Sequence, residues 1–181
     1  MKKTHNNNLR VLKALNFFVE NPYDEIYLRE FGRKLKISVN SAQRFLNLLL
    51  KQKFIVEYRR ANLRCFKANL NSIVFRSIKI VFSLRDIEDS SLIDFLKENK
   101  FSQVVLFGSI AKGLGDSRSD IDLVCIGMKK VNISKFEKKL NRKINAHFFS
   151  LSEWNKTKSS NKAFYQDVIV DGISLIGRLP I

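Results

Sequence analysis

The sequence predicts an α+β protein of two modules, one helical with a β-hairpin and one a small mixed α/β sheet. The chain has 181 residues, which suits two small domains. Residues 1–80 hold 17 Lys and Arg against 5 Asp and Glu, whereas the rest hold 16 against 12. Helical spacing of apolar residues dominates the first part, and short apolar strands alternate with amphipathic helices in the last part. We therefore expect modules over 1–70 and 91–181, joined by a connecting helix over 71–90.

Composition and sequence order favour a cytoplasmic protein with no membrane partner. No apolar run reaches the roughly 18–20 residues that a membrane helix needs. The N-terminal segment is basic but turns polar, so it is a poor signal peptide. Cys65 and Cys125 lie in apolar, strand-like runs, which indicates buried thiols and not a disulfide or metal site.

Three helices and a hairpin are expected in the first module. Residues 9–20 form an amphipathic helix that ends at Asn21-Pro22, and residues 25–36 form a second, short helix. Ser38 is a suitable N-cap for a third helix over 39–52. This third helix buries one apolar stripe and exposes a polar face, formed by Asn40, Ser41, Gln43, Arg44 and Asn47. Two alternating strands follow, and the hairpin between them carries Arg59, Arg60 and Arg64.

This order of elements resembles a winged helix-turn-helix domain over residues 8–70. The resemblance implies a recognition helix at 39–52, a wing at 58–64 and DNA as a partner. Amide and guanidinium groups on an open helix face suit base edges, and arginines on a hairpin suit the phosphate backbone. One alternative is a module that only docks proteins or dimerises. The overall excess of basic residues could also reflect a host whose proteins are generally rich in lysine. That explanation would not account for the concentration of positive charge in the first half of the chain.

The joint between the modules is helical and lacks glycine and proline. Its apolar residues cover more than one side of the helix over 71–86, which indicates a packed helix. We interpret it as a helix wedged between the modules or as the seam of a homodimer. A separate helix begins at Ser90 or Ser91.

The second module carries a pair of acids on a strand and a Gly-Ser turn before it. Asp120 and Asp122 are two residues apart, so a strand would project both to one face. Two close carboxylates repel unless they bind a cation, and hard oxygen ligands favour Mg²⁺ or Mn²⁺. Gly108 and Ser109 end the preceding strand where a short helix begins, so they could cradle a phosphate, with Lys112 adding charge. Metal and phosphate together predict a bound nucleoside triphosphate.

The spacing Gly-Ser, ten residues, Asp, one residue, Asp resembles the signature of DNA polymerase β-like nucleotidyltransferases, especially their minimal branch. The resemblance runs over 92–177 and includes the segment FYQDVIVDGISLIG. It implies that Asp120 and Asp122 hold metal ions and that Gly108 and Ser109 grip the β and γ phosphates. An NMP, with ATP as the expected donor, would pass to a protein or nucleic-acid hydroxyl, and a partner toxin protein is one possible acceptor. In a purely structural interpretation of these two acids, Asp120 lies in a turn and Asp122 is a charged residue at the edge of the sheet.

The third carboxylate of active family members is not found at its expected place. The strand KINAHFF offers Asn145 there, and an amide can give a metal an oxygen but no charge. His147 projects to the same face and could act as a base, or could be an ordinary strand histidine. Glu137, Asp167 and Asp171 fit the position less well. Two hypotheses follow: a nucleotidyltransferase with a DNA-binding module, or a DNA-binding regulator whose nucleotide-binding domain is not catalytic.

Overall fold

The computed structural model describes residues 2–127 and 129–181 of the chain. These residues form two compact units, Met1–Ile78 and Lys79–Ile181, which are described separately. The division falls inside helix α4 (Ile73–Asp89). Within the described residues, no helix combines the length and the apolar character needed to cross a membrane.

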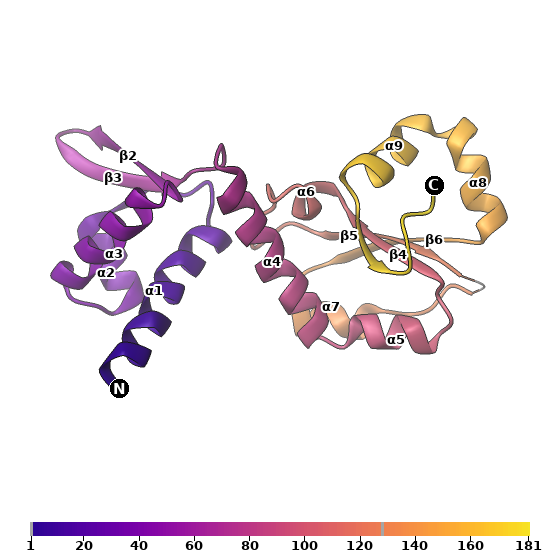
Figure 1. The fold of residues 1–181 in the computed structure, drawn as a ribbon, viewed down its shortest axis with the longest axis horizontal. Coiled ribbons are helices and arrows are strands. Elements are labelled where there is room, and N and C mark those ends of the chain that lie inside the picture. The colour runs from indigo at the N-terminus through magenta and orange to yellow at the C-terminus, as the bar shows by residue number, and fades with distance from the viewer. Residues whose placement is uncertain (1, 128) are drawn as a thin grey trace. The chain divides into compact units, whose positions relative to one another are not determined.

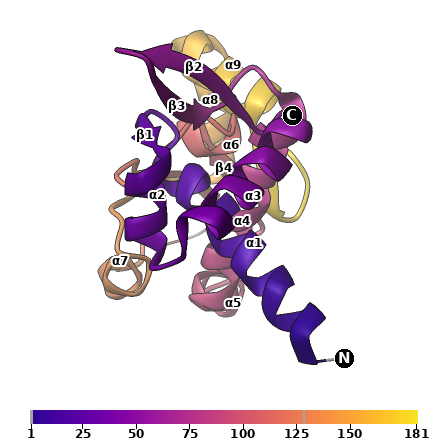
Figure 2. The same cartoon turned by 90° about the vertical axis from the view of Figure 1, so that its left-hand side faces the viewer.

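The first unit packs three helices against a three-stranded antiparallel sheet of order β1-β3-β2, seen in Figure 2. Its elements are α1 (Lys2–Glu20), β1 (Ile26–Tyr27), α2 (Leu28–Leu35), α3 (Val39–Lys51), β2 (Ile55–Arg60) and β3 (Leu63–Ala68). The rings of Phe17, Phe18 and Phe31 meet between α1 and α2, with centroids 5.2 to 5.5 Å apart. The positive φ angles of Ala61 and Asn62 close the hairpin between β2 and β3.

Helix α3 has the predicted start and the predicted buried face. The Ser38 hydroxyl accepts a hydrogen bond from the Ser41 backbone N–H at 3.2 Å, which confirms the N-cap. Its buried residues are Ala42, Phe45, Leu46 and Leu49. The prediction for the preceding helix was wrong at its start. Ile26 and Tyr27 pair with Phe66 and Cys65 as a third strand, because β-branched and aromatic residues suit a sheet and Ile26 is fully buried there.

The second unit contains a four-stranded mixed sheet of order β6-β5-β4-β7. Strand β5 pairs antiparallel with β4 and parallel with β6, while β4 and β7 are antiparallel. Its elements after α4 are α5 (Leu92–Glu98), β4 (Gln103–Phe107), α6 (Gly108–Ala111), β5 (Ile121–Ile126), α7 (Ser134–Leu140), β6 (Ile144–Phe149), α8 (Leu151–Ser160), α9 (Lys162–Asp171) and β7 (Ile173–Ile176).

Helices cover both faces of this sheet (Figure 1). Helices α5 and α7 and the end of α4 pack on one face, around Leu92, Leu96 and Phe136. Helices α8 and α9 cover the other face, where Trp154 and Val168 pack against Val105 and Val124. Alternate residues of each strand therefore face different helix pairs, and a polar residue in a strand faces one pair only.

Helix α8 is absent from the sequence prediction, although its start carries a recognisable signal. Ser150 and Glu153 form a capping box, in which each side chain accepts a hydrogen bond from the other residue's backbone N–H. The predicted burial of the two cysteines is confirmed, because Cys65 and Cys125 are both buried free thiols.

Candidate functional site

The site is organised by one row of residues across three neighbouring strands. The register pairs Phe107 of β4 with Asp122 of β5, and Asp122 with Asn145 of β6. All three lie on the sheet face that α8 and α9 cover, because Val105 and Val124 two positions away pack on that side. Asp122 is half-buried at the start of its strand, where the sheet ends and the loops begin.

Gly108 follows Phe107 and turns the chain directly over Asp122. Its φ of +75° lies in the left-handed region, and a Cβ built on it would fall on the Asp122 carboxylate. The backbone can therefore approach the carboxylate only because this residue lacks a side chain. Helix α6 begins here and exposes Ser109, whose carbonyl accepts hydrogen bonds from the N–H groups of Leu114 and Gly115, both at 2.9 Å.

Asp120 precedes strand β5 by one residue, so the strand begins later than the sequence prediction placed it. Its side chain is exposed, whereas that of Asp122 is half-buried. The next residue, Ile121, donates its N–H to the carbonyl of Lys143 at 2.9 Å and thereby joins the start of β5 to β6.

Asn145 occupies the place beside Asp122 where the sequence predicted it. Its amide Nδ2 donates a hydrogen bond to Oδ1 of Asp122 at 3.1 Å. No group of three His, Cys, Asp or Glu side chains capable of holding a metal ion occurs within residues 2–127 and 129–181. The oxygen donors that Asp120, Asp122 and Asn145 carry are two carboxylates and one amide oxygen, and Mg²⁺ and Mn²⁺ prefer hard oxygen ligands of this kind.

Lys112 lies at the end of α6 and is engaged by two acids of α9. Its Nζ is 3.0 Å from Oδ2 of Asp171 and 3.3 Å from Oδ1 of Asp167. Hydrogen bonds to Asp171 and then to Asp167 raise the pKa of Lys112 above its usual value. Any phosphate that binds Lys112 must compete with these two carboxylates.

Comparison with known families agrees with this geometry. Residues 89–170 match the family model described as "Nucleotidyltransferase domain". The match covers less than half of the chain, and over this stretch the sequence is similar to a nucleotidyltransferase domain. The match contains the acidic pair, the Gly-Ser turn and Asn145.

Two solved structures resemble part of the chain, and the search of curated proteins found no match. One is described as the crystal structure of a toxin-antitoxin with AMP-PNP, and is 23% identical over 50% of this chain and 73% of its own, with a TM-score of 0.36. The other is a mutant of the toxin-antitoxin MntA-HpeT, and is 22% identical over 50% of this chain and 72% of its own, with a TM-score of 0.34.

His147, inside the stretch that matches the family model, lies in an aromatic cluster. Its ring centroid is 5.9 Å from that of Phe107 and 5.2 Å from that of Phe164. The other acids that the sequence offered have separate contacts. Glu137 accepts a hydrogen bond from the Ile144 N–H at 2.9 Å, and Asp167 and Asp171 contact Lys112.

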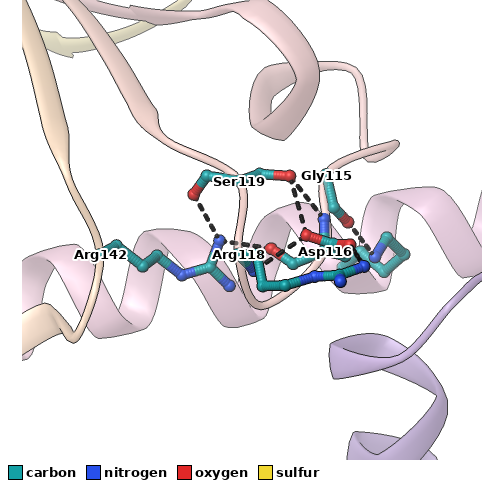
Figure 3. Close-up of polar contacts among 6 residues, drawn as sticks. Gly115, Asp116, Arg118, Ser119 and Arg142 are labelled. Atoms are coloured by element: carbon teal, nitrogen blue, oxygen red, sulfur yellow. Dashed lines mark hydrogen bonds and ion pairs between the residues drawn. The ribbon is translucent and has the colours of Figure 1, made fainter.

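Two basic residues that hold the loop between α6 and β5 were missed by sequence reasoning. Lys79 donates to the carbonyl of Gly115 at 2.6 Å, and Arg142 donates to those of Asp116 and Ser119. Figure 3 shows the Arg142 guanidinium beside the turn that contains Asp116 and Ser119. A lysine in an amphipathic helix and an arginine after one carry no sequence signal for such contacts, because both depend on where the helices pack.

In the first unit, the residues predicted to meet DNA fall into two groups. Arg64 contacts both Glu57 and Gln43, and Gln43 in turn donates to Asn47 at 2.8 Å. These contacts join α3 to the hairpin. The remaining residues lie on α3 or at the hairpin end, and all except the half-buried Ser41 are exposed: Asn40, Ser41, Arg44, Arg59 and Arg60. Arg60 is also 3.3 Å from the carboxylate of Glu25.

Proposed function

We propose that the protein is a metal-dependent nucleotidyltransferase. It binds a nucleoside triphosphate, which is expected to be ATP, and transfers the NMP part to a hydroxyl group of a protein or nucleic acid. The observation that carries this proposal is the contact between Gly108 and Asp122. A turn able to bind phosphate lies directly against a half-buried carboxylate. Phosphate binding and metal binding are therefore expected at adjoining positions, as a metal–triphosphate substrate requires.

Asp120 and Asp122 are the residues that would hold the divalent cation. Their carboxylates are the charged oxygen donors of the site, and Asn145 adds a neutral one if its amide oxygen turns toward the ion. When bound, the cation neutralises charge on the triphosphate and on the departing pyrophosphate.

The chain's own groups would bind and orient the reacting parts. The N–H groups at the start of α6 and the Ser109 hydroxyl donate to the β and γ phosphates, and Lys112 adds charge after exchanging Asp167 and Asp171 for phosphate oxygens. The acceptor oxygen forms a bond to the α-phosphorus while the bond to the bridging oxygen breaks, and pyrophosphate leaves. The proton of the acceptor hydroxyl passes to a carboxylate of the acidic pair and then to solvent.

A second candidate function is a regulator that binds a nucleotide without transferring it. The hydrogen bond from Asn145 to Asp122 favours this candidate. It places a neutral donor where a third carboxylate would add negative charge, so both metal binding and deprotonation of the acceptor would be weaker.

Labelling with [α-³²P]ATP and Mg²⁺ in a cell extract separates the two candidates. Transfer of label by the wild type and by Asn145→Ala, but not by the double variant Asp120→Ala with Asp122→Ala, is expected for the transferase. Mg²⁺-dependent binding of an ATP analogue that requires both acids, without transfer, would favour the regulator. Absence of both activities would contradict both candidates. Mass spectrometry of the labelled species identifies the acceptor, with a small partner toxin protein among those expected.

We further propose that the first unit is a winged helix-turn-helix that binds DNA. The proposal is supported by the excess of basic residues in this half of the chain and by its exposed polar groups on α3 and arginines on the hairpin. The cluster of Arg64, Gln43 and Asn47 holds α3 and the hairpin at a fixed spacing, as binding to adjoining stretches of one duplex requires.

A further inference from the structure

The loop between the phosphate turn and the acidic pair is fixed by contacts to its main chain. Residues 112–120 connect α6 to β5 and contain little regular structure. Lys79 of α4 is only 4% exposed, and its Nζ donates to the carbonyl of Gly115 at 2.6 Å. A buried ammonium needs such an acceptor, because burial without a hydrogen bond is costly.

Arg142 holds the other end of the same loop. Its Nη1 donates to the carbonyl of Asp116 at 2.7 Å and to that of Ser119 at 3.2 Å (Figure 3). One guanidinium thus spans both ends of the turn that Asp116 and Ser119 form. Within this turn, the Asp116 N–H donates to the Ser119 hydroxyl at 2.8 Å, and Arg118 contacts the Asp116 carboxylate from the solvent side at 3.0 Å.

The same stretch of chain brackets Asp120 on both sides. The carbonyl of Ser119, the residue before it, accepts a hydrogen bond from Arg142, and the N–H of Ile121, the residue after it, donates to the carbonyl of Lys143. Asp120 itself precedes the strand and is exposed. Its backbone position is therefore fixed by residues 142 and 143 together, although its side chain is outside the sheet.

We infer that Lys79 and Arg142 are positioning residues, which set the place of Asp120 relative to Asp122 and so determine the affinity of the acidic pair for a divalent cation. This inference rests on the proposed function, because it assigns the acidic pair to metal binding. The hydrogen bonds described above for Lys79 and Arg142 go to main-chain carbonyl groups of the loop. Both act on carbonyl groups, so their effect depends on the loop's path and not on its side chains.

The test measures binding of Mn²⁺ alone to the full chain, from the electron paramagnetic resonance signal of the unbound ion. Arg142→Met and Lys79→Met are each expected to weaken Mn²⁺ binding about 10-fold or more, as loss of groups that orient metal ligands commonly does. Arg142→Lys keeps the charge but lacks the planar guanidinium that fixes the direction of both hydrogen bonds, so an intermediate affinity is expected. Hydrogen exchange is expected to accelerate in residues 113–121 of the Met variants, and not in the centre of β4 or β5.

Matched controls separate positioning from loss of charge or of stability. Arg118→Met removes a cation that contacts the same loop only from solvent, and Arg85→Met removes one from the exposed side of α4. Both are expected to bind Mn²⁺ like the wild type. Folded Arg142→Met and Lys79→Met variants with wild-type affinity would overturn the inference while leaving the proposed function intact. Wild-type Mn²⁺ binding that survives Asp120→Ala with Asp122→Ala would overturn the proposed function, and the inference with it.

Discussion

The amide of Asn145 donates a hydrogen bond to the carboxylate of Asp122 across two parallel strands, with 3.1 Å between Nδ2 and Oδ1. Replacing Asn145 with Asp puts two carboxylates at this place. In an exposed position their repulsion is expected to lower the free energy of unfolding by about 1 kcal/mol without metal, and Mg²⁺ should restore it. Thermal unfolding with and without Mg²⁺ measures this, with Asn145→Ala as the control. A melting temperature of Asn145→Asp that does not respond to Mg²⁺ would contradict a cation site here.

Gly108 tests the contact that carries the proposed function. In Gly108→Ala, the alanine would have to adopt a φ of +75° and its Cβ would collide with the Asp122 carboxylate. We therefore expect loss of Mn²⁺ binding and reduced stability. In an Asp122→Ala background the collision is absent, and only the backbone cost of about 1 kcal/mol remains. Urea unfolding of the four proteins in this cycle gives the coupling energy. Equal costs in both backgrounds would show that the carboxylate does not limit residue 108.

Loss of the ion pairs that Lys112 forms with Asp167 and Asp171 is expected to strengthen nucleotide binding. Asp167→Asn and Asp171→Asn each remove one exposed ion pair, worth up to about 1 kcal/mol, so ATP affinity should rise by up to about fivefold. The gain should vanish when Lys112→Met is added. Calorimetric titration with a non-hydrolysable ATP analogue measures the affinity, and Asp94→Asn, which breaks the remote pair with Lys97, is the control. A gain that persists without Lys112 would remove this lysine from the phosphate site.

Lys79 gives the protein a specific dependence of stability on pH. Burial, followed by the nearby Arg142, lowers the pKa of Lys79 to about 8, whereas Asp116 acts in the opposite direction. Between pH 8 and about 10.5 the unfolded chain keeps a proton that the folded chain has released, so the free energy of unfolding rises with pH by up to roughly 3 kcal/mol. Denaturant unfolding of wild type and Lys79→Met across this window measures the difference. Parallel curves would contradict the lowered pKa.

The hairpin arginines provide the test of DNA binding. Arg59→Glu together with Arg60→Glu should abolish binding to duplex DNA and reduce the slope of log affinity against log salt. Arg64 is left unchanged, because its contacts with Glu57 and Gln43 make its loss a structural change. Arg85→Glu with Arg178→Glu alters the net charge equally in the second unit and serves as the control. Fluorescence anisotropy measures both pairs, and equal effects would contradict a hairpin contact.

Local patterns predicted the parts of the site that local sequence determines. The Gly-Ser turn of residues 108 and 109 lies between two adjacent strands, and the acidic pair lies at the start of the second strand. In the next strand, side chains alternate between the two faces of the sheet, and the register places Asn145 beside Asp122. The exception is Asp120, which the sequence pattern placed on the strand. Hydrogen bonds to the next strand begin at Ile121, and a period-two pattern does not encode where such pairing starts.

Contacts between distant segments could not be predicted. Lys79 and Gly115 are 36 residues apart, and Lys112 meets Asp167 across 55 residues. Each pair depends on how a helix packs on the sheet, which a charge pattern along the helix does not reveal. Helix α8 differs, because its capping box of Ser150 and Glu153 is a local signal that sequence reasoning overlooked.

The position of Lys79 has a practical consequence for dissecting the protein. The family match begins at residue 89, so a truncated chain cut there would retain the turn, the acids and the sheet. It would lack the lysine that holds the Gly115 carbonyl, because that lysine belongs to the part of α4 that precedes the match. Weakened metal binding in such a fragment would then reflect the missing contact to the loop and not a fault of the acidic pair, so the second unit should be expressed with the whole of α4.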